Sequence, residues 1–106
     1  AESDARAGPA GGSAKDARKT AAEARARVAP LRREVEAIEK RMETLNRKIA
    51  ETDAALADPS LFTRDAAKAV TLGKARAEAA DRLEAAEREW MEAAEAYETA
   101  KVEAGV

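Results

Sequence analysis

The chain has 106 residues, of which 38% are charged and 3% are aromatic, with a formal net charge of −2 and neither histidine nor cysteine. Most of its apolar residues are alanine, which favours helix but buries little surface, so a thick globular core is excluded and long solvated helices are expected. Without histidine and cysteine the chain lacks the usual zinc ligands, thiol nucleophile and general base, and we expect no metal site, disulfide or catalysis.

No apolar run approaches the ~20 residues that a membrane span needs, and no apolar core of a secretory signal follows the N-terminus. We therefore expect a cytoplasmic location. The chain opens on Ala1 rather than methionine, which suggests a piece excised from a longer protein.

The N-terminal part divides into a linker and a helix. Residues 1–13 contain Gly8-Pro9 and Gly11-Gly12-Ser13 without apolar periodicity, which predicts a disordered linker. Residues 14–29 combine alanine, lysine, arginine and glutamate and favour helix. Pro30 is tolerated in the first turn of a new helix and kinks a helix that begins earlier. We expect a first helix over about 14–57, with its main arm beginning at Leu31.

This main arm carries a coiled-coil seam. Apolar positions recur at alternating spacings of four and three, with only Thr52 polar among them. The members are Leu31, Val35, Ile38, Met42, Leu45, Ile49, Thr52 and Leu56.

A tip over residues 58–62 follows the first helix. Asp58 is placed to cap a short turn at Pro59, and Leu61 with Phe62 is expected to form an apolar plug. Thr63 is the expected N-cap of a second helix over about 63–102.

The second helix repeats the seam in mirror order. Its members are Leu72, Arg76, Ala79, Leu83, Ala86, Trp90, Ala93 and Tyr97. Folding the chain back at the tip pairs the two series with residue numbers summing to 121, as for Ile38 with Leu83. The sequence therefore predicts an all-α fold, an antiparallel two-helix coiled-coil hairpin over 14–103. In this register Arg76 extends over Leu45.

The two aromatic residues of the second helix have two interpretations. Trp90 and Tyr97 lie one heptad apart in the same phase as Leu83, which favours core packing over base stacking.

Charge is distributed unevenly along the chain. Residues 14–50 hold eleven basic and six acidic residues, whereas residues 78–106 hold three basic and nine acidic residues. Charge matching between antiparallel helices explains part of this difference. A basic helix face that contacts phosphate is the functional interpretation, with Lys15, Arg18, Lys19, Arg25 and Arg27 as the best candidates.

Six further cations extend this candidate nucleic-acid site as dibasic pairs. They are Arg32, Arg33, Lys40, Arg41, Arg47 and Lys48. The sequence pI near 5.3 is far below the value typical of dedicated nucleic-acid-binding proteins, so binding is expected to be non-specific and sensitive to salt.

The sequence from Ala29 to Phe62, ending in LADPSLF, and the segment EREWMEAAEAYE resemble the C-terminal coiled-coil domain of ABC-F ATPases. The resemblance covers roughly residues 14–101. It implies an accessory arm of a cytoplasmic protein with two ATP-binding cassettes that acts on nucleic acid or at the ribosome. In the Uup-type branch the arm binds DNA, whereas in other branches it approaches ribosomal RNA. Residues 17–30 lack the K-L-S-Y-K-E motif of the Uup type, and Leu31-Arg32-Arg33-Glu34 is similar to ribosome-associated branches.

No G-x-x-x-x-G-K-[ST] phosphate loop occurs in the chain, so we expect no ATPase activity and no cofactor here. The resemblance places ATP and magnesium in the cassettes of the parent protein. A structural coiled coil that docks a protein partner or dimerises weakly is the alternative, because a two-helix hairpin with one thin seam is marginally stable.

Overall fold

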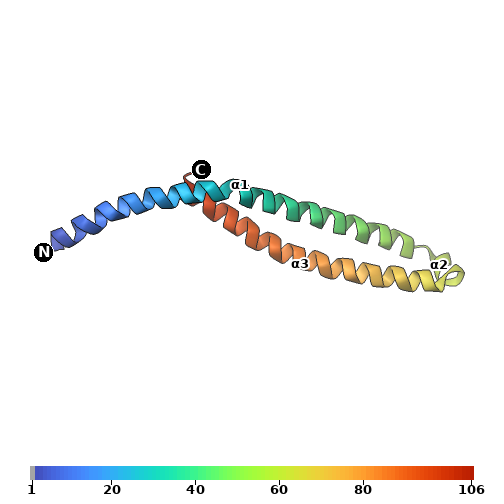
Figure 1. Ribbon diagram of the computed structural model, residues 1–106. Helices are drawn as coiled ribbons and strands as arrows, with labels where there is room; N and C mark the ends of the chain where they lie inside the picture. The colour runs from blue at the N-terminus through green and yellow to red at the C-terminus, as the bar shows by residue number, and fades with distance from the viewer. Residues whose placement is uncertain (1) are drawn as a thin grey trace. The chain divides into compact units, whose positions relative to one another are not determined.

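The computed structural model describes residues 2–106, and side chains from residue 13 onward. Over that range it contains three helices, α1 (Glu2–Leu56), α2 (Pro59–Arg64) and α3 (Ala66–Ala104) (Figure 1). The chain divides into two compact units. The terminal unit comprises Ala1–Val35 and Ala93–Val106, and the tip unit comprises Glu36–Glu92. In each unit a segment of α1 packs against an antiparallel segment of α3, which confirms the helical hairpin.

Helix α1 continues through Pro30 without a break, so of the two alternatives for Pro30 the structure has the one in which the helix begins earlier. An interior proline removes one backbone hydrogen bond and crowds the preceding turn. The seam nevertheless keeps its phase across it, from Ala24 and Val28 to Leu31 and Val35, and all four side chains are buried or half-buried. Burial of one continuous stripe therefore outweighs the local cost of the proline.

The helix begins before the expected boundary at residue 14. The backbone of residues 2–13 is helical, whereas its glycines predict a linker. Ala1 lies outside the described residues, and the linker boundary remains a prediction.

Every predicted seam position on both helices is buried or half-buried. In the tip unit the least exposed seam residues include Ile38, Ala79 and Ala86, and in the terminal unit they include Ala24 and Ala100. Four of these five residues are alanines, which allow the two backbones to approach closely. Among the described residues no large side chain is completely buried, so the core is a single thin layer.

The surroundings of Leu45 differ from the predicted ones. Leu45 and Ala79 line the same cavity of about 60 Å³ between the helices. Arg76 was expected over Leu45, and this prediction is wrong, because its guanidinium pairs with Asp53. Helical side chains lean toward the N-terminus of their own helix, so Arg76 on α3 reaches toward the tip and meets a residue late in α1.

Two more contacts cross between the helices of the tip unit. Arg41 pairs with Glu89 at 2.5 Å, and the indole Nε1 of Trp90 donates a hydrogen bond to Glu39 at 3.2 Å. Trp90 is half-buried in the seam, which supports core packing of its ring. Its polar edge is satisfied at the helix surface, as expected for a tryptophan at the border of a core.

Helix α2 forms the tip of the hairpin. Asp58 caps it by accepting a hydrogen bond from the amide of Ser60 at 3.0 Å, and Pro59 occupies its first turn, which confirms the predicted cap. Leu61 is buried, but Phe62 is 55% exposed, so the prediction that both form an apolar plug is wrong. A helical turn places adjacent residues about 100° apart, so only one of the two can face inward.

The second long helix begins two residues later than predicted. Asp65, not Thr63, is its N-cap, because the Asp65 carboxylate accepts a hydrogen bond from the amide of Lys68 at 3.0 Å. The Thr63 hydroxyl instead donates to the Ser60 carbonyl within α2. Both residues are suitable caps, and the extra helical turn of α2 decides between them.

Candidate nucleic-acid interface

All eleven predicted site residues lie on α1, and all are exposed. The terminal unit holds Lys15, Arg18, Lys19, Arg25, Arg27, Arg32 and Arg33. The tip unit holds Lys40, Arg41, Arg47 and Lys48. The structure therefore divides the candidate site into two groups that differ in charge balance.

The four cations of the tip unit are balanced by acids. Arg47 pairs with Glu43 one turn before it, at 3.4 Å, and Arg41 pairs across the hairpin with Glu89. The four acids Glu34, Glu36, Glu39 and Glu43 match the four cations between residues 34 and 50. This part of α1 has no basic excess with which to attract a polyanion.

On α1, from residue 13 onward, the excess of positive charge is confined to residues 15–33. Seven basic residues stand there against two acids, Asp16 and Glu23. Over 18 residue steps a helix rises about 27 Å, long enough to pass several phosphates of one strand. The terminal unit therefore carries the only basic excess on α1 from residue 13 onward.

Six of these seven cations share one face of α1. Arg18, Arg25 and Arg32 are spaced by seven residues, and the others follow at spacings of three, four or fourteen from a member of the set. These spacings place side chains on the same side of a helix. We call this set the basic face: Lys15, Arg18, Lys19, Arg25, Arg32 and Arg33.

Arg27 does not belong to the basic face. Its side chain lies on the other flank of the seam, where the guanidinium pairs with Glu103 of α3 at 3.1 Å. Charge matching between the helices thus accounts for Arg27 and for Arg41. It does not account for the basic face, because within the part of the chain whose side chains are described no cross-helix ion pair is present at Lys15, Arg18, Lys19, Arg25 or Arg33.

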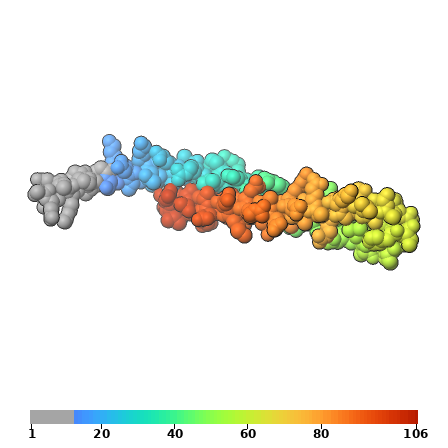
Figure 2. Space-filling model, turned by 90° about the horizontal axis from the view of Figure 1, so that it is seen from below, coloured from blue at the N-terminus to red at the C-terminus, as the bar shows by residue number. Residues whose placement is uncertain are grey.

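The first part of the basic face is not covered by α3. Every residue from Ser13 to Thr20 is exposed, whereas Ala24 is fully buried. Figures 1 and 2 agree that the blue segment of α1 extends past the red end of α3 within the terminal unit. Lys15, Arg18 and Lys19 are therefore accessible around most of the helix.

The sequence already contained the signal that separates Arg27 from the basic face. The seam through Ala24 and Val28 fixes the phase of α1, and the seven-residue spacing of Arg18, Arg25 and Arg32 can be read from the printed letters. Membership of the terminal unit could not be read in this way, because it depends on where α3 ends.

Over the described residues, no helix is both long and apolar enough to cross a membrane. Comparison with known proteins gives a match to one family. Residues 30–95, more than half of the chain, match the model of the ABC transporter C-terminal domain. No curated protein and no solved structure shows a significant match. The chain therefore belongs to the ABC transporter C-terminal domain family.

Proposed function

We propose that this chain is the accessory C-terminal arm of an ABC-F ATPase and that its basic face contacts the phosphates of DNA or ribosomal RNA. Membership of the ABC transporter C-terminal domain family supports the role of an accessory domain. The parent protein would act in the cytoplasm. ATP and magnesium would bind in its cassettes, while the hairpin itself would hydrolyse nothing.

One observation carries the proposal. Six exposed cations share one face of α1, and five of them make no ion pair with any described residue. Lysine and arginine side chains held in this way release counterions when they meet a polyanion, which is the main source of non-specific affinity for nucleic acid. An exposed cation that serves only charge matching would be expected to face an acid of α3, as Arg27 does.

The same observation sets the character of the binding. The basic face consists of lysines and arginines alone, and acids outnumber basic residues on α3 from Glu78 onward. Contact with phosphate positions a protein on a duplex without selecting a sequence. The proposal is therefore one of weak, sequence-independent and salt-dependent attachment.

The proposal is tested with a variant that removes five charges from the basic face. The substitutions are Lys15→Gln, Arg18→Gln, Lys19→Gln, Arg25→Gln and Arg33→Gln. Fluorescence anisotropy with a labelled DNA duplex and a labelled RNA duplex measures affinity at several salt concentrations. We expect the slope of log affinity against log salt to fall from about −4 to above about −1, because each lost phosphate contact removes about 0.7 to 0.9.

A control variant removes five charges elsewhere on the chain. Its substitutions are Lys40→Gln, Arg47→Gln, Lys48→Gln, Lys68→Gln and Lys74→Gln, all at exposed positions. The two variants have equal net charge. Equal losses of affinity would show that binding follows net charge alone, and an unchanged affinity of the first variant would exclude the basic face.

A further inference from the structure

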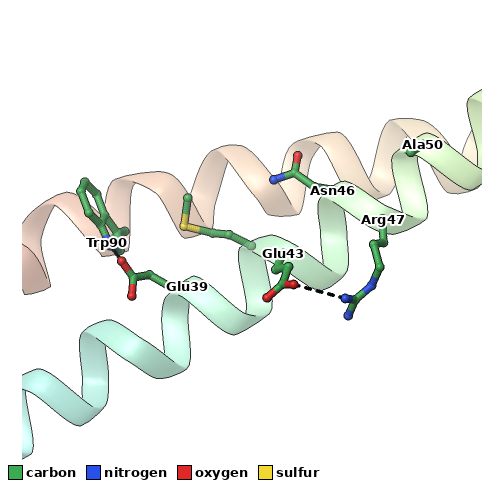
Figure 3. A pocket seen from close by; sticks show the side chains of 7 residues that line it. Glu39, Glu43, Asn46, Arg47, Ala50 and Trp90 are labelled. Carbon is green, nitrogen blue, oxygen red and sulfur yellow. Dashed lines mark hydrogen bonds and ion pairs between the residues drawn. The ribbon is translucent and has the colours of Figure 1, made fainter.

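The tip unit contains an apolar groove beside the stretch of α1 that has no basic excess. Met42, Asn46 and Ala50 line it from α1, and Trp90 lines it from α3 (Figure 3). Its volume is about 560 Å³, within the range of sites that hold ligands or large side chains. The groove therefore has room for more than one apolar side chain of a partner.

The lining of the groove on α1 is long enough for a helical partner. Its lining residues on α1 recur at spacings of three and one from Glu39 to Ala50, which is a single stripe along the helix. This stripe is about 16 Å long, the length of about three helical turns. An amphipathic helix binds such a groove with anchors at spacings of three, four and seven residues.

Carboxylates outnumber cations at the groove and restrict its occupant. Glu39 and Glu43 line it, and the charge of Arg47, the basic lining residue, is engaged by Glu43 at 3.4 Å (Figure 3). Glu87 lies three residues before Trp90 on α3 and is also exposed, so it faces the same side. This negative field repels nucleic acid and anionic lipid and attracts a cationic peptide.

Another exposed apolar side chain follows Trp90 on α3. Met91 is 63% exposed and lies four residues after Glu87, on the same side of the helix. Methionine adapts its shape to different partners, and tryptophan at a groove wall supplies a large rigid contact area. Figure 3 shows the Trp90 ring beside Glu39, to which its Nε1 donates a hydrogen bond.

We infer that this groove docks a basic amphipathic helix of a protein partner. Apolar side chains of that helix insert beside Trp90 and Met42. Its lysines or arginines meet Glu39 and also Glu43, where they compete with Arg47. A second copy of this chain is a poor fit, because the large apolar residues of its own basic segment, Val28 and Leu31, are engaged in the seam. This docking surface is separate from the basic face and does not depend on the proposed function.

The test uses a synthetic peptide of three to four helical turns that lacks tryptophan. It carries leucines on one face at spacings of three, four and seven and lysines or arginines beside them. Trp90 is the chain's single tryptophan, so its emission reports directly on the groove. We expect a saturable shift of this emission to shorter wavelength. A scrambled peptide of the same composition, which lacks the apolar face, should give no such shift.

Variants of the intact chain locate the site. Glu39→Gln with Glu43→Gln keeps an oxygen that accepts the Trp90 hydrogen bond but removes both charges, and we expect about five-fold weaker binding. Ala50→Gln places a longer side chain in the groove at an exposed helix position, and it should reduce binding while leaving helicity intact. Glu51→Gln with Glu95→Gln removes two exposed charges outside the lining and should change affinity little.

Three outcomes would overturn the inference. The first is equal binding of the ordered and scrambled peptides. The second is a loss of affinity in the Glu51 and Glu95 variant as large as that in the Glu39 and Glu43 variant. The third is binding of the peptide without any change in Trp90 emission.

Discussion

Two glycines near opposite ends of α3 place different demands on the backbone. Gly105 has a φ of +77° and follows the last helical residue, with its amide donating to the Val102 carbonyl at 3.1 Å. This is the left-handed conformation that ends many helices, and glycine adopts it without steric cost. Gly73 lies inside the helix, and a Cβ built there meets no atom within 4 Å. Gly73 therefore does not serve to bring another helix close to α3.

Substitution of these glycines by alanine should have opposite effects on stability. Gly73→Ala should raise the free energy of unfolding by about 0.5 to 1 kcal/mol, because alanine lowers the entropy of the unfolded chain and fits the open space. Gly105→Ala should lower it, because alanine disfavours positive φ. Urea unfolding followed by circular dichroism measures both. A destabilising Gly73→Ala would show that the position needs glycine.

Ile38 and Val70 provide a matched test of the seam. Ile38 is 3% exposed, whereas Val70 is 57% exposed on the outer surface of α3. Ile38→Ala should lower the free energy of unfolding by about 2 to 4 kcal/mol, because it removes buried methylene groups and leaves a cavity. Val70→Ala should change it by less than about 0.5 kcal/mol. Equal effects in denaturant unfolding would contradict the proposed thin core.

At the scale of elements, the tip is held by carboxylates that act as ions. The Arg76 guanidinium lowers the pKa of Asp53 from its usual range, mainly by hydrogen bonding. Hydrogen bonds from the Ser60 hydroxyl and amide lower the pKa of Asp58 in the same way. Each carboxyl group therefore binds protons less readily in the folded chain than in the unfolded chain, so acid favours unfolding.

This difference predicts the direction of the pH dependence. The stabilisation is complete above the unfolded pKa of about 3.9 and is lost as the pH falls through the lower folded values. Asp53→Asn should be less stable than the natural chain near neutral pH and should lose less stability on acidification. Thermal unfolding at neutral and strongly acidic pH measures the difference. Identical losses in the two proteins would show that the Asp53–Arg76 pair contributes nothing to acid sensitivity.

The sequence predicted the helices and the seam, because a period of 3.5 residues over about seven turns in each helix leaves little ambiguity. It did not predict the local choices at the tip. Thr63 and Asp65 are both good caps, and only the length of α2 selects Asp65. The partner of Arg76 was also predicted wrongly, because the seam spacing does not specify in which direction a long side chain leans. The direction in which a long side chain leans then determines which residue it contacts.

The candidate site was predictable in part. The sequence located its cations and the seam phase, but it treated all eleven residues as one site. The structure separates them, because Arg27 reaches Glu103 and the tip-unit cations lie among acids. The apolar groove was not predicted, since Trp90 and Met42 are seam residues by phase. Their partial exposure depends on which neighbours are small.

At the scale of the whole molecule, the two units carry different kinds of surface. The terminal unit carries the basic face, and the tip unit carries an apolar groove with acidic surroundings. We therefore assign polyanion contact to the terminal unit alone.

The most direct test is an NMR titration of the isotopically labelled chain with short DNA and RNA duplexes at low and physiological salt. The account predicts amide shifts concentrated in residues 13–33 that diminish as salt rises, while the amides of residues 36–92 stay unchanged. The stronger ligand of the two would identify the preferred nucleic acid. Shifts centred on α3 or the tip, or no shifts with either duplex at low salt, would contradict the proposed function.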